Sequence, residues 1–225
     1  MEKPISWLRI DERTDVLASL SLCLKTLDMV TDEPAQWKWA ILSIHNALQG
    51  AMVCHLSGTA DVGALTDKCA KEWWSWHDRD GRGKIKRIDT GIGALGIQEA
   101  RFASKTDHPP DEILADTKTL FKRLYKADKR VEGGAGAELI VDETSRRSFY
   151  RLHDLRRNFA HFTPKAWSIE IDGLPQIFEH MLGILRNIAS DPWPFRHMDE
   201  EEKTKLDVLL SELQNTTRRL KDLLI

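Results

Sequence analysis

Apolar residues recur at steps of three and four positions through most of this sequence, which is the spacing that places them on one face of an α-helix. The segment from residue 34 to residue 56 shows the pattern most clearly, at Trp37, Ile41, Ile44, Leu48 and Met52. Prolines, glycines and acidic residues stand between such segments and mark where helices begin and end. The sequence therefore predicts a mainly α-helical chain.

The helical pattern and its flanking signals divide the chain into successive elements. We expect helices over residues 11–30, 34–56, 62–76, 111–129, 142–162, 174–189 and 199–223. Residues 137–141 favour a short strand, and residues 165–173 predict a short extended or β-hairpin arm, because apolar and polar side chains alternate there. Residues 78–110 predict an irregular insertion, since Gly81 and Gly83 interrupt a basic run.

The size and charge of the chain restrict the class of protein to which it can belong. A length of 225 residues, with 41% hydrophobic and 30% charged residues, suits one globular domain with a sizeable core. We expect a single helical domain over residues 1–225 that ends in a C-terminal helix over residues 199–225. The net charge of −2 argues against a surface that binds nucleic acid over its whole area. Local basic patches remain, on residues 118–130 and 146–157.

Cysteine usage and hydropathy indicate the compartment. Cys23, Cys54 and Cys69 are not spaced as metal ligands, so free thiols in a reducing cytosol are expected, with no metal and no cofactor. The chain begins with a charged segment, which predicts no signal peptide. The most apolar stretch, residues 40–56, is too short and too polar to span a bilayer. These features predict a cytoplasmic protein without a membrane partner.

The segment 145–161 is strongly basic and contains Arg156 and His161 just before the helix-breaking Pro164. An arginine is a permanent cation and a histidine titrates near neutral pH, so together they can hold a phosphoryl oxygen and move a proton. On an ideal helix these two side chains point about 140° apart, whereas Arg157 and His161 share a face. A basic helix end with a histidine is also common for structural reasons, because cations favour helix C-termini.

Two segments of the chain resemble the HEPN superfamily of prokaryotic helical proteins. They are residues 155–168, which contain an arginine and a histidine at the family's spacing of four to six intervening residues, and residues 37–50. Arg156 and His161 match the two anchors of the motif. Arg157 departs from the family, in which Asn, Asp or His commonly follows the arginine, and Asn158 comes one place later.

The resemblance implies an all-α antiparallel helical bundle that usually dimerises, with two motifs facing each other. Many such proteins are metal-independent ribonucleases of toxin–antitoxin or phage-defence systems, so RNA, a second copy of the chain and an antitoxin or other protein partner are expected. Others keep the fold and bind without cleaving, which is the alternative here: a non-catalytic binding or assembly module.

The resemblance also assigns roles to residues of the basic segment. Arg156, His161 and Asn158 would be catalytic: the RNA's own 2′-hydroxyl would attack the adjacent phosphate, His161 would act as base or acid, and Arg156 would bind the phosphoryl oxygens. His153 is the local alternative to His161. The residues expected to contact the RNA backbone are Arg157, Arg151, Lys122 and Lys126. A solvated outer face explains the same charges equally well.

Polar residues also occur within the expected helix over residues 34–56. His45, Asn46 and Gln49 lie on or near one face of this helix. Such a group, once buried, needs full hydrogen bonding, so we expect a structural polar network there rather than a ligand site.

Overall fold

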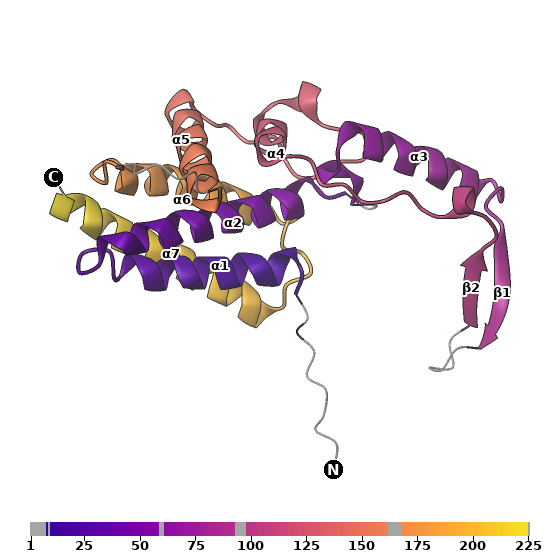
Figure 1. Cartoon of the computed structure of the whole chain (residues 1–225), viewed down its shortest axis with the longest axis horizontal. Helices are drawn as coiled ribbons and strands as arrows, with labels where there is room; N and C mark the ends of the chain where they lie inside the picture. Colours follow the sequence, from indigo (N-terminus) through magenta and orange to yellow (C-terminus); the bar gives the residue numbers. More distant parts are fainter. Residues whose placement is uncertain (1–7, 9, 59–60, 93–97, 162–167, 225) are drawn as a thin grey trace, which may run out of the picture.

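The computed structural model describes residue 8 and residues 10–58, 61–92, 98–161 and 168–224. Most of the described chain is helical (Figure 1). The helices are α1 (Glu12–Leu27), α2 (Trp37–Leu56), α3 (Asp67–Gly81), α4 (Thr117–Tyr125), α5 (Glu143–Ala160), α6 (Leu174–Ser190) and α7 (Glu200–Leu224). Two strands, β1 (Arg87–Ile92) and β2 (Gln98–Phe102), form an antiparallel hairpin. The expected all-α bundle with a small hairpin is confirmed.

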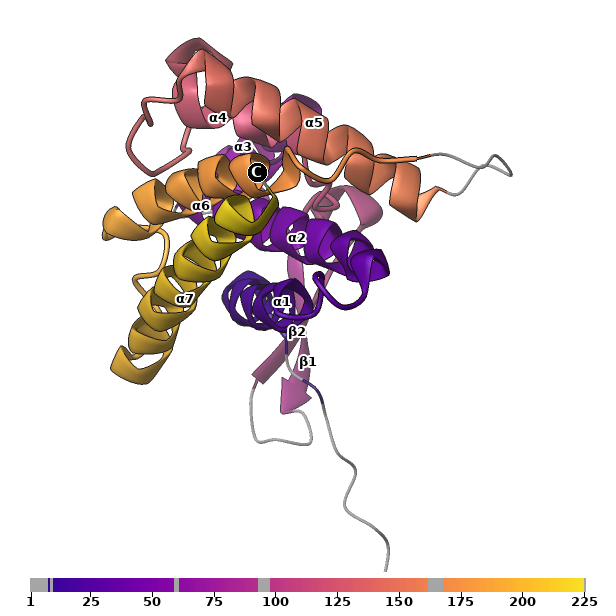
Figure 2. The same cartoon turned by 90° about the vertical axis from the view of Figure 1, so that its left-hand side faces the viewer.

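Helix α2 lies at the centre of the bundle and packs against α1, α4, α5 and α6 (Figure 2). Apolar side chains cover most of its circumference, as expected for a helix surrounded by others. Trp37 at its start meets the Phe178 ring of α6 edge-on, with ring centroids 5.6 Å apart. α7 packs on α1 and α6 and completes the core.

Aromatic stacking joins α4 to α5. The rings of Phe121 and Phe149 lie 3.7 Å apart and nearly parallel, and both side chains are fully buried. Arg146 of α5 lies over the ring of Tyr125 at the far end of α4. Because these contacts fix α4 along α5, the two basic helices lie side by side.

The helix expected over residues 111–129 is shorter than predicted. α4 begins only at Thr117, where the Asp116 side chain accepts the N–H of Thr119 as a helix cap. Residues 111–115 are instead extended and form backbone hydrogen bonds with residues 64–66, including an isolated bridge between Leu65 and Leu114. The acidic residues after the two prolines therefore do not start the helix.

The strand expected over residues 137–141 is absent, because other groups hold this backbone. The N–H of Ala137 binds the carboxylate of Asp191, and the N–H of Leu139 binds the carbonyl of Leu124. No strand forms in the described part of the short extended or β-hairpin arm expected over residues 165–173: residues 168–171 have neither helix nor strand and residues 172–173 form a turn, whereas residues 165–167 lie outside the described residues.

The hairpin occurs instead within the predicted insertion over residues 78–110. Its register pairs Arg87 with Phe102, with an irregularity between Asp89 and Gly91. With α3 it projects from the bundle (Figure 1). An ion pair of 2.7 Å between Arg87 and Asp80 ties the hairpin to the end of α3. A second, small apolar cluster beneath α3 comprises Val62, Leu65, Cys69 and Ala70.

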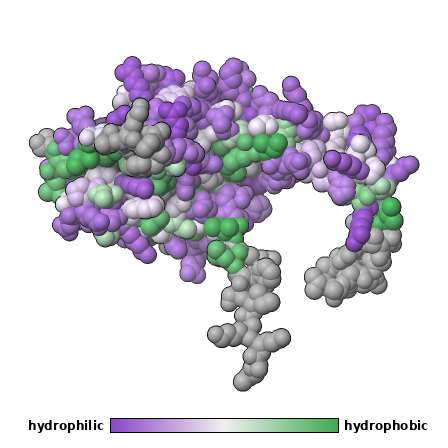
Figure 3. All heavy atoms as spheres, viewed as in Figure 1, coloured by the Kyte–Doolittle hydropathy of each residue, from purple (hydrophilic) through white to green (hydrophobic). Residues whose placement is uncertain are grey.

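Hydrophilic residues cover much of the face seen in Figure 3, with apolar patches between them. Among the described helices, none combines the length and the apolar character that crossing a membrane requires.

Candidate functional site

The basic motif lies at the end of α5. The Asp142 side chain caps the start of this helix by accepting the N–H of Ser145, and the helix runs to Ala160. His161 is the first residue beyond it, and its backbone N–H still binds the carbonyl of Arg157 at 2.9 Å. The chain leaves helical geometry only at His161, so the preceding motif residues keep ordinary helical directions.

The predicted catalytic residues differ in exposure. His161 and Asn158 are exposed, whereas Arg156 is half-buried with its Nε atom sealed from solvent. Arg156 is close enough to α2 for its charge to act on the ring of His45. Arg156 thus lies toward the bundle while His161 lies in solvent, in keeping with the angle between the two positions on an ideal helix.

The four residues predicted to contact RNA are all exposed. Arg151 and Arg157 belong to α5, Lys122 belongs to the neighbouring α4, and Lys126 is the first residue after α4. Arg151, Arg157 and Lys122 have no ion-pair partner within the part of the chain that the structure describes. The Lys126 ammonium lies 6.0 Å from the centre of the Tyr125 ring. The two helices therefore present free cations, which can contact phosphates.

A histidine pair, which the sequence pattern did not reveal, joins α2 to α5 beside Arg156. Nε2 of His45 lies 3.2 Å from Nδ1 of His153. His45 is buried and His153 is half-buried, with the Phe149 ring stacked on it. The two histidines are 108 residues apart in sequence, so helical spacing alone could not pair them.

Both members of the pair are neutral at neutral pH. Burial, together with the nearby His153 ring and the Arg156 charge, lowers the pKa of His45 to about 3. Burial also lowers the pKa of His153, and the Lys118 charge acts in the same direction. A neutral imidazole has one N–H and one lone pair, so one ring donates a hydrogen bond to the other.

The polar network expected on α2 is not a single network. His45 faces His153, Asn46 is exposed, and Gln49 accepts a hydrogen bond of 2.9 Å from the Thr117 hydroxyl of α4. Of these three residues, only His45 is buried.

Arg156 has neither a hydrogen bond nor an ion pair with any residue in the described parts of the chain. Half-buried arginines usually have acceptors, because removing a guanidinium from water without a partner costs free energy. The unpaired guanidinium therefore marks this flank of α5 as a candidate site for an anionic ligand.

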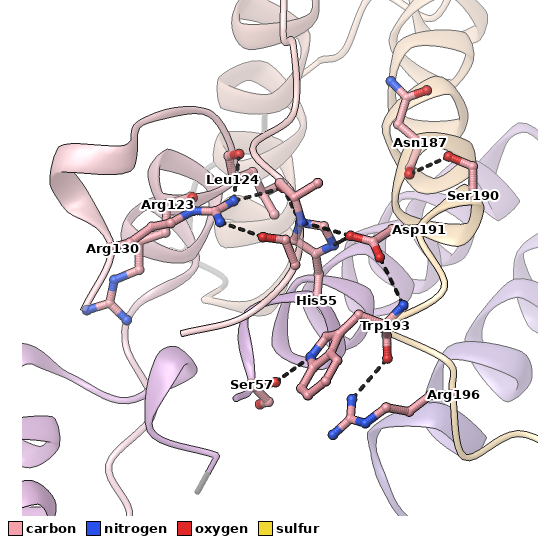
Figure 4. A network of polar contacts seen from close by, with 12 residues as sticks. His55, Ser57, Arg123, Leu124, Arg130, Asn187, Ser190, Asp191, Trp193 and Arg196 are labelled. Carbon is pink, nitrogen blue, oxygen red and sulfur yellow. Dashed lines mark hydrogen bonds and ion pairs between the residues drawn. The ribbon is translucent and has the colours of Figure 1, made fainter. Parts of the chain in front are cut away.

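A second polar network, at the other end of α2, serves the fold (Figure 4). The fully buried His55 binds the carbonyl of Ala137 through Nε2 at 2.8 Å, and Asp191 accepts the N–H groups of Ala137 and Trp193. Arg130 donates to four backbone carbonyls in the same region. Because nearly all of these groups bind backbone, the network holds loops together and leaves little capacity for a ligand.

One groove lies away from the motif. It has a volume of about 1170 Å³ and runs between α3 and residues 102–113, with Lys71, Lys105, Trp76 and Phe102 among its lining residues. None of the predicted catalytic or RNA-contacting residues lines it.

Metal-ligating side chains do not gather in the described parts of the chain: no three His, Cys, Asp or Glu residues are placed to share an ion. Cys23, Cys54 and Cys69 are free thiols and are buried.

Comparison of the chain with protein-family models, with curated proteins and with solved structures gave no match. The candidate function therefore depends on the geometry of α5 and its neighbours.

Proposed function

We propose that this chain is a metal-independent endoribonuclease of the HEPN type, in which Arg156 and His161 act on a phosphodiester of RNA. The observation that supports this proposal most strongly is the guanidinium of Arg156, which binds no described residue, five positions before the exposed His161 at the end of a basic helix. One group can hold the phosphoryl oxygens and the other can transfer a proton.

In the proposed reaction the 2′-hydroxyl of a ribose attacks the adjacent phosphorus atom, and the 5′-oxygen of the next nucleotide leaves. A base removes the proton of the 2′-hydroxyl and an acid protonates the leaving oxygen, so the products are a 2′,3′-cyclic phosphate and a 5′-hydroxyl. His161 takes one of these two roles, and Arg156 binds the non-bridging oxygens. Asn158, exposed on the same end of α5, donates a hydrogen bond to the phosphate or ribose.

The remaining cations bind the RNA on either side of the reacting phosphate. Arg151 and Arg157 extend along α5, while Lys122 lies on the adjoining α4 and Lys126 directly follows its end. Such contacts are independent of base sequence and position the strand.

A homodimer would complete this site. One chain supplies a single motif histidine, and Arg156 and His161 of one chain point in different directions, so a second copy would bring the missing proton-transfer partner. A cytoplasmic toxin or phage-defence effector, restrained by an antitoxin or another protein, is the biological role that we propose for this activity.

One observation favours a second function, a helical module that binds without cleaving. The charge of the half-buried Arg156 acts on the buried His45, whereas His161 is exposed beyond the end of α5. In that case the cations of α4 and α5 bind a polyanion, and His161 takes no part in chemistry.

The test uses the purified full chain and a labelled oligoribonucleotide in buffer with EDTA. The nuclease predicts fragments that end in a 2′,3′-cyclic phosphate, and a substrate with a single 2′-deoxyribose at the cleaved position should remain intact. Binding without any fragments would support the second function, and fragments with a 3′-hydroxyl would contradict the proposed reaction.

A further inference from the structure

The His45–His153 contact fixes which nitrogens of the two rings carry protons. Nδ1 of His45 is buried and has no hydrogen-bond partner among the described residues. A proton there would form a sealed N–H without an acceptor, which is rarer and costlier in proteins than an unused lone pair. His45 is therefore protonated on Nε2 and donates to Nδ1 of His153, across the distance of 3.2 Å.

The proton of His153 must then reside on its other nitrogen. With Nδ1 accepting from His45, the neutral ring carries its hydrogen on Nε2. This N–H has no partner within the described chain, and the side chain is half-buried rather than sealed. His45 thus turns His153 into a fixed hydrogen-bond donor beside Arg156.

Positive charge surrounds this donor. Lys118 comes from α4, Arg156 and Arg157 come from α5, and each acts electrostatically on His153. Among the charged groups that act on the ring, Asp154 is acidic, and its carboxylate lies 3.9 Å from the Lys118 ammonium. From α2 the neutral His45 faces the ring, so the three cations outnumber the acid.

We propose that Nε2 of His153, the guanidinium of Arg156 and the ammonium of Lys118 form a phosphate-binding site, which His45 holds in position. The site has three hydrogen-bond donors and a local excess of positive charge over the nearby carboxylate of Asp154, which suits a phosphate and disfavours a metal ion. Nδ1 of His153 is already occupied by His45, which removes it as a metal ligand.

The phosphate belongs to the backbone of a single-stranded polynucleotide. Arg157 follows His153 by four residues, so the two side chains share one face of α5, and the exposed His161 is the first residue beyond the end of this helix. A row of donors suits a chain of phosphates better than it suits one free ion. This assignment rests on the proposed function in taking RNA as the polynucleotide, but the site binds phosphate whether or not the strand is cleaved.

Binding is measured by fluorescence anisotropy with a labelled single-stranded oligoribonucleotide whose 2′-oxygens are methylated, so that it cannot be cleaved through them. His153→Phe keeps a ring against Phe149 and removes the donor, and Arg156→Gln removes the charge. Each should raise Kd about tenfold, the usual effect of one hydrogen bond to a charged group. Arg147→Gln is the matched control, because Arg147 is exposed on the same helix and paired with Glu143; it should change Kd less than about twofold.

The role of His45 is tested by comparing two substitutions at this position. His45→Gln retains a side-chain N–H that can reach His153, whereas His45→Leu has none. We expect His45→Leu to weaken oligonucleotide binding several-fold and His45→Gln to restore most of it, with circular dichroism confirming that both variants fold.

Nitrogen NMR of the imidazole rings gives a readout that does not depend on affinity. His45 and His153 should both be neutral and protonated on Nε2 at pH 7, and the Nε2 signal of His153 should shift when the methylated oligonucleotide is added. A proton on Nδ1 of His153, or unchanged Kd in both site variants, would overturn the site. If inorganic phosphate shifts the Nε2 signal of His153 as much as the oligonucleotide does at the same concentration, the assignment of a polynucleotide ligand is overturned. If the oligonucleotide binds but RNA is not cleaved, only the proposed nuclease activity is contradicted.

Discussion

Two arginines show how differently one side chain can serve this protein. Arg123 is fully buried and donates to the carbonyls of Gly63 and Leu65 and to the carboxylate of Asp67. Arg156 is half-buried and binds no residue that the structure describes. The first connects α4 to the segment before α3, while the second is free to bind something else.

This difference predicts that the same substitution destabilises the fold strongly at one position and hardly at all at the other. Arg123→Met leaves two buried carbonyls and a carboxylate without their donor, so the free energy of unfolding should fall by about 3 kcal/mol. Arg156→Met removes a charge that binds no described residue, and it should change the free energy of unfolding by less than about 1 kcal/mol. Urea denaturation measures both. An equal loss in the two variants would make Arg156 a structural residue and would weaken its assignment as a ligand-binding group.

The burial of His45 predicts a pH-dependent stability. Its pKa of about 3 in the folded chain lies below the ordinary value of 6.5, so the unfolded chain binds a proton that the folded chain rejects as the pH falls. The stability that neutral His45 supplies is complete above pH 6.5 and is lost between pH 6.5 and about 3. Its contribution to the slope is at most about 1.4 kcal/mol per pH unit.

Denaturation at pH 7.5 and at pH 5 should therefore show a smaller difference in unfolding free energy for His45→Gln than for the wild type. An identical difference would show that His45 does not control this part of the pH dependence. His55, whose pKa burial also lowers, remains in both proteins and contributes equally to each.

At the level of elements, helical periodicity predicted the position of most helices. It failed where backbone hydrogen bonds to distant residues decided the conformation. Residues 111–115 follow two prolines and are acidic, which is typical of a helix start, yet they pair with residues 64–66. The position of the hairpin also escaped prediction, because residues 78–110 combine glycines and charges without the clear alternation that residues 167–172 show.

The candidate site was only partly predictable for the same reason. The exposure of His161 and the placement of Arg157 follow from the position of the helix end, which the residue preference before Pro164 indicates. The pairing of His45 with His153 depends on how α2 packs against α5, and that packing is a tertiary property.

The hairpin should be dispensable for the bundle. Strands β1 and β2 contact mainly each other, and an isolated two-stranded hairpin contributes little stability in water. Replacing residues 88–101 with a short Gly-Ser linker keeps Arg87 and Phe102 and should change the free energy of unfolding by less than about 1 kcal/mol. A cooperative thermal transition near that of the full chain would agree, whereas a broad or strongly lowered transition would show that the hairpin supports the bundle.

For the molecule as a whole, the uneven placement of charge is more informative than its sum. The net charge is −2, yet Arg151, Arg157 and Lys122 lie exposed on two adjoining helices, and the exposed Lys126 directly follows the end of α4. A polyanion should therefore bind through a few local contacts, and the rest of the surface should contribute little.

The salt dependence of RNA binding gives the number of phosphate contacts that these cations make. About four phosphate contacts predict a slope of about −3 for the logarithm of the binding constant against the logarithm of salt concentration, since each contact on a single strand contributes about −0.7. Arg157→Gln should make the slope less steep by about one contact. A slope near zero would contradict backbone binding, and a slope twice as steep would require cations beyond α4 and α5.

The most direct measurement is the cleavage rate of a defined oligoribonucleotide in EDTA by the wild type, His161→Ala and His197→Ala. His197 is an exposed histidine between α6 and α7 and serves as the matched control. The proposed function predicts that the wild type and His197→Ala cleave at the same rate and that His161→Ala is slower by about 100-fold or more. Equal cleavage by all three proteins, or no cleavage by the wild type, would contradict the catalytic role of His161.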